Sequence, residues 1–138
     1  MQEVQQINIE NKSWPDDRGW VVDLLAAEGI SIGSIGDFHI TSINPGKERG
    51  NHFHKNATEW IFFLGGRATL LWRKVGGKSV NKIEVTRNNP TLYKIPRNIE
   101  HTVVNSGKGD IYLIAISDNE NRNTVKSVRL TNHYNPTS

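Results

Sequence analysis

Short segments rich in β-branched and aromatic residues, each ended by glycine, proline or asparagine, make up most of this sequence. Residues 37–43 alternate between the two faces of an expected strand and stop at Asn44-Pro45-Gly46, a typical turn sequence. Residues 59–64 end at Gly65-Gly66, and residues 67–73 follow at once, which predicts a hairpin between these two segments. Further strands are expected at 82–86, 91–95, 102–105 and 111–117.

Helix signals are weak throughout the sequence. Only residues 21–27 could form a short helix, and they could equally form a strand, because no apolar stripe with helical period is long enough for a core helix. Many short strands at regular spacing favour an all-β sandwich or barrel with little helix. A chain of 138 residues has the length of one domain, so we expect a single domain over 1–138 with a polar, peripheral tail after Ser127.

Composition excludes several classes of function. The chain has no cysteine, which rules out a disulfide scaffold, a thiolate nucleophile and an iron–sulfur cluster. Its net charge of +3 suits a phosphorylated small molecule but is too weak and dispersed for nucleic acid. No apolar run reaches the roughly 18–20 residues of a membrane span, and residues 1–6 lack the apolar core of a signal peptide. We therefore expect a cytoplasmic protein without a nucleic-acid or membrane partner.

Three of the five histidines, together with one glutamate, have the spacing of a metal site. His52 and His54 alternate on one expected strand, so both imidazoles face the same side. Glu59 opens the next apolar strand, and His101 lies downstream of a proline turn. Three imidazoles and one carboxylate are a common ligand set for zinc, iron, manganese or nickel, and an octahedral ion would keep about two positions open.

The spacing resembles the first sequence motif of the cupin superfamily at every fixed position from Gly46 through His52, His54 and Glu59 to Gly66. The second cupin motif is partly matched, with asparagine and proline where glycine is usual. The residues that match this second motif are Pro96, His101 and Asn105. The resemblance covers residues 17–118 and implies a double-stranded β-helix, or jelly-roll barrel, with the site inside the barrel.

A narrower resemblance connects the chain to the sugar-nucleotide branch of the cupins. It rests on Asp16-Asp17-Arg18-Gly19 and on Arg49-Gly50-Asn51-His52 within the first motif. This branch includes dTDP-4-dehydrorhamnose 3,5-epimerase-like proteins, sugar-nucleotide 3,4-ketoisomerases and the C-terminal cupin of capsular-polysaccharide-assembling enzymes, to which the chain is most similar. The resemblance implies epimerisation or ketoisomerisation of a nucleotide-linked 4-keto sugar in surface-polysaccharide synthesis, with His52 and His54 as catalytic residues.

The identity of the base depends on the metal. A histidine that gives its lone pair to a metal cannot also accept a proton, so a metal-loaded site needs another base, such as Tyr93 or a metal-bound hydroxide. Without metal, His54 is the favoured base and Glu59 orients it. The candidates to hold the diphosphate through charge-assisted hydrogen bonds are Arg49, Lys47 and Arg67.

Two other functions remain compatible with the same residues. An Fe- or Mn-dependent cupin oxygenase uses the same ligand set, and a non-catalytic sugar-binding or regulatory cupin could keep it. Trp60 and Phe62 should point out of the barrel if Glu59 points in, and a face bearing them would need cover, so we expect a homodimer. His39 is interpreted as a structural or pocket-wall residue, and His133 as solvent-exposed.

Overall fold

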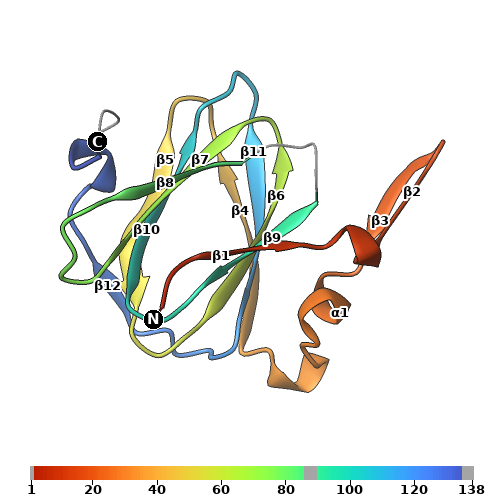
Figure 1. Ribbon diagram of the computed structural model, residues 1–138, viewed down its shortest axis with the longest axis horizontal. Coiled ribbons are helices and arrows are strands. Elements are labelled where there is room, and N and C mark those ends of the chain that lie inside the picture. The colour runs from red at the N-terminus through yellow and green to blue at the C-terminus, as the bar shows by residue number, and fades with distance from the viewer. Residues whose placement is uncertain (1, 86–89, 135–138) are drawn as a thin grey trace.

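The computed structural model describes residues 2–85 and 90–134, and within them two antiparallel five-stranded sheets face each other as a barrel (Figure 1). The first sheet has the order β1-β9-β6-β11-β4. Its strands are β1 (Gln5–Asn8), β4 (Asp37–Ile43), β6 (Glu59–Gly65), β9 (Thr91–Ile95) and β11 (Ile111–Ser117). The second sheet has the order β12-β5-β10-β7-β8. Its strands are β5 (Glu48–His54), β7 (Ala68–Lys74), β8 (Asn81–Val85), β10 (Ile99–Asn105) and β12 (Thr124–Lys126).

The predicted all-β cupin fold is confirmed. Every strand expected from the sequence is present, although residue 86 at the end of one of them lies outside the described residues. Residues 21–27 divide between the end of β3 (Gly19–Val22) and helix α1 (Leu24–Glu28). Asp23 caps this helix by accepting a hydrogen bond from the backbone N–H of Ala26, and Gly29 ends it in the left-handed conformation.

The predicted hairpin between residues 59–64 and 67–73 is wrong. Strand β6 pairs with β9 and β11, whereas β7 pairs with β8 and β10 in the opposite sheet. Gly65 has a φ of +96°, and a Cβ there would lie 2.8 Å from the carbonyl oxygen of Asp110. Gly65 and Gly66 therefore connect a strand of one sheet to a strand of the other. The prediction failed because turn residues indicate where the chain reverses direction but not which strand pairs with which.

The two ends of the barrel interior differ in character. Side chains alternate along β4, so Asp37, His39, Thr41 and Ile43 face inward while the residues between them are exposed. Near Ile43 the interior is filled by a cluster of apolar side chains. This cluster includes Ala68, Leu70, Val103, Ile111 and Leu113. Polar residues are therefore collected at the opposite end, where β4 begins and β5 and β11 end.

The N-terminal segment covers the outer face of the first sheet. Trp60 and Phe62 do point out of the barrel, but they are buried by neighbours that include Ile9 and the α1 region. The indole N–H of Trp60 donates to Glu28 of α1 at 3.1 Å. Because the chain itself covers these two aromatic side chains, they do not provide the exposed face on which the homodimer was predicted.

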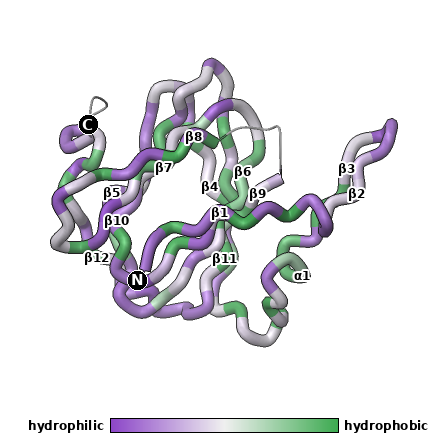
Figure 2. The backbone as a smooth tube through the Cα atoms, viewed as in Figure 1, coloured by the Kyte–Doolittle hydropathy of each residue, from purple (hydrophilic) through white to green (hydrophobic). Residues whose placement is uncertain are grey.

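The hairpin formed by β2 (Ser13–Asp16) and β3 projects away from the barrel, and its free end is hydrophilic (Figures 1 and 2). Short 3-10 helices lie at Glu10–Lys12, Ile32–Ser34 and Leu130–Asn132. No helix in the described parts of the chain has the length and apolar character needed to cross a membrane.

The C-terminal segment is attached to the barrel more firmly than its polar sequence suggested. Strand β12 pairs with β5, and Leu130 beyond it is fully buried. The side-chain oxygen of Asn51 accepts a hydrogen bond from the backbone N–H of Leu130 at 3.0 Å. Both sheets therefore include a strand outside residues 17–118, and residues 135–138 of the predicted tail lie outside the described residues.

Asn105 provides a test of how the apolar end is closed. Its side-chain amide donates to the carbonyl oxygens of Ile43 and Gly109 at 2.9 and 2.8 Å, and its oxygen accepts from the N–H of Gly107. Asn105→Ala should lower the free energy of unfolding by roughly 2–4 kcal/mol, because backbone groups lose their partners in a buried turn. Urea unfolding measures this, with the exposed Asn132→Ala as control, and equal stability of the two variants would contradict it.

Candidate functional site

Three imidazoles meet at the polar end of the barrel. His52 and His54 lie on β5, and His101 lies opposite His52 on β10. The rings of His52 and His101 are 4.8 Å apart between centroids, those of His54 and His101 are 5.4 Å apart, and one nitrogen of each ring lies within 4.8 Å of the others. His52 and His54 lie on the same side of β5 because side chains alternate along a strand. His101 joins them because β10 pairs with β5.

A β-bulge sets the alignment of β5 with β10. His101 pairs with His52 but the next residue, Thr102, pairs with Gly50, which leaves Asn51 as the extra residue. Gly50 has a φ of +114°, and a Cβ there would lie 2.7 Å from the carbonyl oxygen of His101. Glycine is therefore required at this position for β5 to approach β10 so closely.

Glu59, the first residue of β6, completes the cluster from the opposite sheet. One of its carboxylate oxygens lies 3.6 Å from Nε2 of His54, and the other lies 3.8 Å from Nε2 of His101. The Glu59 side chain is buried, as are His54 and His101. The structure therefore brings together the four residues that the sequence predicted as metal ligands.

Hydrogen bonds at the far side of the rings fix which nitrogen faces the cluster. Nδ1 of His101 donates to the carbonyl oxygen of Ile99 at 2.9 Å, so its Nε2 carries the lone pair. Nδ1 of His54 is 2.9 Å from the hydroxyl of Thr124. Nε2 of His54 is buried and has no hydrogen-bond partner among the described residues. Nε2 of His54, Nε2 of His101 and the Glu59 carboxylate together fit the binding of a divalent cation. The hydrogen bonds at Nδ1 of the two rings would hold these ligands in orientation.

Burial controls the protonation of the cluster. Loss of solvation lowers the pKa of His54 to about 4 and that of His101 to about 3, and it also lowers the pKa of His52. The same loss of solvation raises the pKa of Glu59 to about 7. The imidazoles are therefore neutral near pH 7, which is the form that binds metal.

Three polar residues that the sequence analysis did not assign to the site extend it toward solvent. Nη1 of Arg122 lies 3.6 Å from Asp37 and 3.7 Å from Glu59. Thr124 supports His54 as described above. Alternation along β4 could have placed Asp37 beside the site, because it shares a face with Ile43. Arg122 gives no such signal, since it lies in an irregular segment before β12.

The basic residues predicted to bind the diphosphate are not gathered at this cluster. The backbone oxygens of Lys47 and Arg67 accept from the N–H groups of Asn105 and Ser106, at the other end of β10. Asn105 lies four residues from His101, about 13 Å along the strand. Between them, Val103 of β10 and its pairing partner Leu70 of β7 lie side by side in the apolar core.

Arg49 lies between these two ends on β5. Its side chain is exposed, and Nε donates to the carbonyl oxygen of Ser42 on β4 at 3.0 Å. His133 is exposed as predicted. His39 faces the polar end of the barrel from β4, consistent with a residue of the pocket wall.

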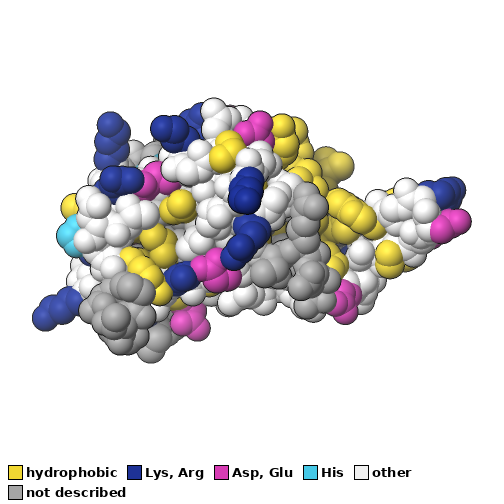
Figure 3. All heavy atoms as spheres, turned by 90° about the horizontal axis from the view of Figure 1, so that it is seen from above, with side chains coloured by type: hydrophobic (Ala, Val, Ile, Leu, Met, Phe, Trp, Pro, Cys, Tyr) yellow, Lys and Arg dark blue, Asp and Glu magenta, His cyan; other side chains and the backbone are white. Residues whose placement is uncertain are grey.

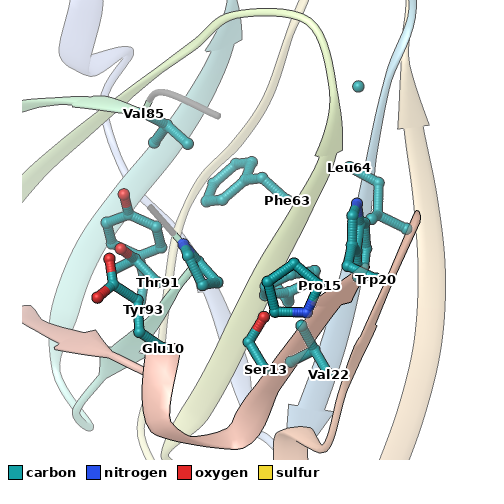
Figure 4. Close-up of a pocket in the computed structure, with 13 residues that line it drawn as sticks. Glu10, Ser13, Pro15, Trp20, Val22, Phe63, Leu64, Val85, Thr91 and Tyr93 are labelled. Carbon is teal, nitrogen blue, oxygen red and sulfur yellow. The ribbon is translucent and has the colours of Figure 1, made fainter. Parts of the chain in front are cut away.

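A separate cavity of about 630 Å³ lies between the projecting hairpin and the first sheet (Figure 4). Trp20 and Pro15 of the hairpin face Phe63 and Tyr93 across it. Tyr93 is buried, which raises its pKa, and its ring packs edge-to-face on Phe63 at 5.3 Å. The residue predicted as an alternative base therefore lines this apolar cavity, and none of the three clustered histidines does.

Comparison with known proteins identifies the fold. Residues 14–126 match the family model for the polysaccharide biosynthesis C-terminal domain. Among curated proteins, none matches the chain in sequence. The capsular polysaccharide assembling protein CapF from Staphylococcus aureus is 21% identical over 83% of this chain, with a TM-score of 0.64. The chain spans only 26–33% of the length of the CapF chains it matches.

Two sugar 3,4-ketoisomerases match over nearly their whole length. The enzyme from Helicobacter canadensis is 20% identical over 92% of each chain, with a TM-score of 0.71. A mutant of QdtA from Thermoanaerobacterium thermosaccharolyticum, in complex with TDP-4-keto-6-deoxyglucose, is 13% identical. It covers 92% of this chain and 89% of that chain, with a TM-score of 0.74. These likenesses show that the chain has the sugar-nucleotide cupin fold.

We predict that the cluster binds one divalent ion in exchange for one proton. His54 and His101 are already neutral above pH 5, burial also lowers the pKa of His52, and Glu59 must lose its proton below its pKa of about 7. The dissociation constant for Zn²⁺ should therefore rise about tenfold for each pH unit from 7 to 5. Calorimetric titration at several pH values measures this slope, and Glu59→Gln should flatten it. A slope of two or more protons would contradict the assignment.

Proposed function

The chain belongs to the polysaccharide biosynthesis C-terminal domain family, and from that premise we propose that it isomerises a nucleotide-linked 4-keto sugar with one bound divalent ion. We favour 3,4-ketoisomerisation over epimerisation. The observation that carries the proposal is the cluster of three histidines and Glu59, three of these four side chains buried and His52 partly buried, on a fold shared with 3,4-ketoisomerases. The reaction would belong to surface-polysaccharide synthesis.

Isomerisation of a keto sugar requires removal of a proton from the carbon beside the carbonyl and stabilisation of the resulting oxyanion. His52, His54, Glu59 and His101 would hold a divalent ion, which would supply Lewis-acid stabilisation of that oxyanion. The protein orients the ring nitrogens through Thr124 and the carbonyl of Ile99. The apolar core behind the cluster excludes water from one side of the sugar.

Arg122 supplies positive charge at the rim of the site. Its side chain is 30% exposed, and its contacts with Asp37 and Glu59 are 3.6 and 3.7 Å, longer than a close ion pair. A guanidinium in that position can rotate toward an anionic substrate and bind phosphate oxygens in bidentate fashion. We therefore assign diphosphate binding to Arg122 ahead of Lys47, Arg67 and Arg49.

Anaerobic incubation with TDP-4-keto-6-deoxyglucose in deuterated water tests the proposed function. The metal-loaded protein should add one mass unit to the sugar and form the 3-keto isomer, as read by mass spectrometry and NMR. His101→Ala should lower the exchange rate by about 100-fold or more, since it removes a ligand from the oxyanion-stabilising site. The exposed His133→Ala should leave the rate unchanged.

The same experiment separates the rival functions. An oxygenase would leave the substrate unchanged without oxygen and consume oxygen in air. A binding module would be stabilised against thermal unfolding by the sugar nucleotide without any exchange. Either result would reject the isomerase proposal.

We also propose that the protein is a homodimer, on a different surface from that expected from the sequence. Val21, Ile32 and Phe38 are exposed and line one surface hollow beside the base of the projecting hairpin. Figure 3 views the molecule from the opposite end of the barrel, where other hydrophobic side chains gather near the base of the hairpin. A contiguous apolar patch of this kind favours a protein contact over free exposure to water.

Light scattering should give a mass twice the 15.6 kDa of one chain. Ile32→Ser combined with Phe38→Ser should shift the protein to monomer, because both substitutions remove apolar area from the proposed contact. Val75→Ser, which changes an exposed apolar residue elsewhere, should leave the mass unchanged. A wild-type mass near 15.6 kDa would reject the dimer.

A further inference from the structure

His39 and Asp37 form a second polar unit at the mouth of the barrel, separate from the three clustered histidines. Both lie on the inward face of β4, and Nδ1 of His39 is 2.6 Å from a carboxylate oxygen of Asp37. We propose that His39 is the base that moves the substrate proton and that Asp37 positions it. This inference rests on the proposed isomerase function and assigns the proton transfer within it.

The hydrogen bond between these two residues determines which ring nitrogen can act. An ionised carboxylate only accepts hydrogen bonds, so Nδ1 of His39 donates to Asp37, and in the neutral ring Nε2 is then the nitrogen with the lone pair. The carboxylate also stabilises the imidazolium that forms when Nε2 takes up a proton. The pair therefore has the two parts that a general base needs, a free lone pair and a partner that fixes the tautomer.

Access distinguishes His39 from the clustered histidines. The side chains of His54 and His101 are 3% exposed, and their Nε2 atoms face the carboxylate of Glu59. The His39 side chain is 36% exposed at the rim, where a sugar can reach it. Nδ1 of His39 is occupied by Asp37, and its ring is not one of the three imidazoles whose nitrogens lie within 4.8 Å of one another. His39 is thus free to take a proton while the other histidines hold the ion.

The two units are close enough to act on one substrate. Asp37 and Glu59 both pair with Ser117, one on each side of β11, so their backbones are two strand spacings apart, about 10 Å. Nη1 of Arg122 bridges the two carboxylates, at 3.6 Å from Asp37 and 3.7 Å from Glu59. A sugar bound at this rim would therefore have the cluster on one side and the His39 imidazole on the other.

The proposed step balances without an added oxidant or reductant. Nε2 of His39 takes the proton from the carbon beside the carbonyl, the C–H electron pair becomes the carbon–carbon double bond, and the carbonyl oxygen takes the negative charge. The carbon that lost this proton carries a hydroxyl group, and the proton of that hydroxyl passes to the former carbonyl oxygen. The His39 imidazolium then returns a proton to the former carbonyl carbon, which leaves the ketone on the adjacent carbon and the base neutral.

Substitution at His39 tests its role separately from metal binding. His39→Asn should lower solvent deuterium incorporation into TDP-4-keto-6-deoxyglucose by about 100-fold or more, the usual contribution of a general base. Its zinc content by elemental analysis and its thermal midpoint should match the wild type, because no cluster ligand has changed. His133→Asn is the matched control and should keep the wild-type rate.

Asp37→Asn tests the positioning role. It should lower kcat by a larger factor than it changes KM, because the amide no longer stabilises the imidazolium in the transition state, whereas the contact with Arg122 affects substrate binding; Asp37→Glu should restore part of the rate. A merely structural carboxylate would instead move KM and the thermal midpoint together.

Each other outcome rejects the inference. If His39→Asn retains exchange within about threefold of the wild type, a different group is the base and the isomerase function still stands. If His39→Asn loses its zinc, His39 is a ligand and not the base. If the metal-loaded wild type incorporates no deuterium, the isomerase function fails and the inference fails with it.

Discussion

The packing of three uncharged imidazoles, two buried and one partly buried, against the buried Glu59 carboxyl group is the interaction on which the rest of this structure depends. Such groups are costly away from water unless hydrogen bonds or a cation compensate them. The bulge at Asn51 aligns β5 with β10, and Thr124 reaches back from β12 to His54. Nε2 of His54 has no hydrogen-bond partner in the part of the chain that the structure describes, and a divalent cation would satisfy it.

The two ends of the barrel have different roles, one in the stability of the fold and the other in the proposed chemistry. The end near Ile43 and Asn105 is closed by apolar packing and by side-chain hydrogen bonds to turn carbonyls. The other end collects the histidine cluster, Arg122 and the His39–Asp37 pair. On this account the two tasks of the isomerisation are assigned to different residues, because the cluster stabilises the oxyanion and His39 moves the proton.

Local spacing carried most of what the sequence could predict. The alternation of His52 and His54, the position of Glu59 and the matched motif identified four side chains that the structure brings together. Pairing between distant strands was not predictable in the same way. The 59–64 and 67–73 segments enter opposite sheets, and Trp60 is covered by an N-terminal segment with no pattern that points to it. Arg122 reaches the site from an irregular segment, which periodicity cannot place. Thr124 reaches it from the short strand β12, which the sequence analysis did not predict.

The most direct measurement is a crystal structure of the zinc-loaded protein with TDP, with anomalous diffraction used to locate the metal. We predict one anomalous peak within about 2.3 Å of Nε2 of His54 and of His101. We also expect the diphosphate at the rim beside Arg122, at the end of the barrel where β4 begins. A metal bound elsewhere, or a diphosphate beside Lys47 and Arg67 at the apolar end, would contradict it.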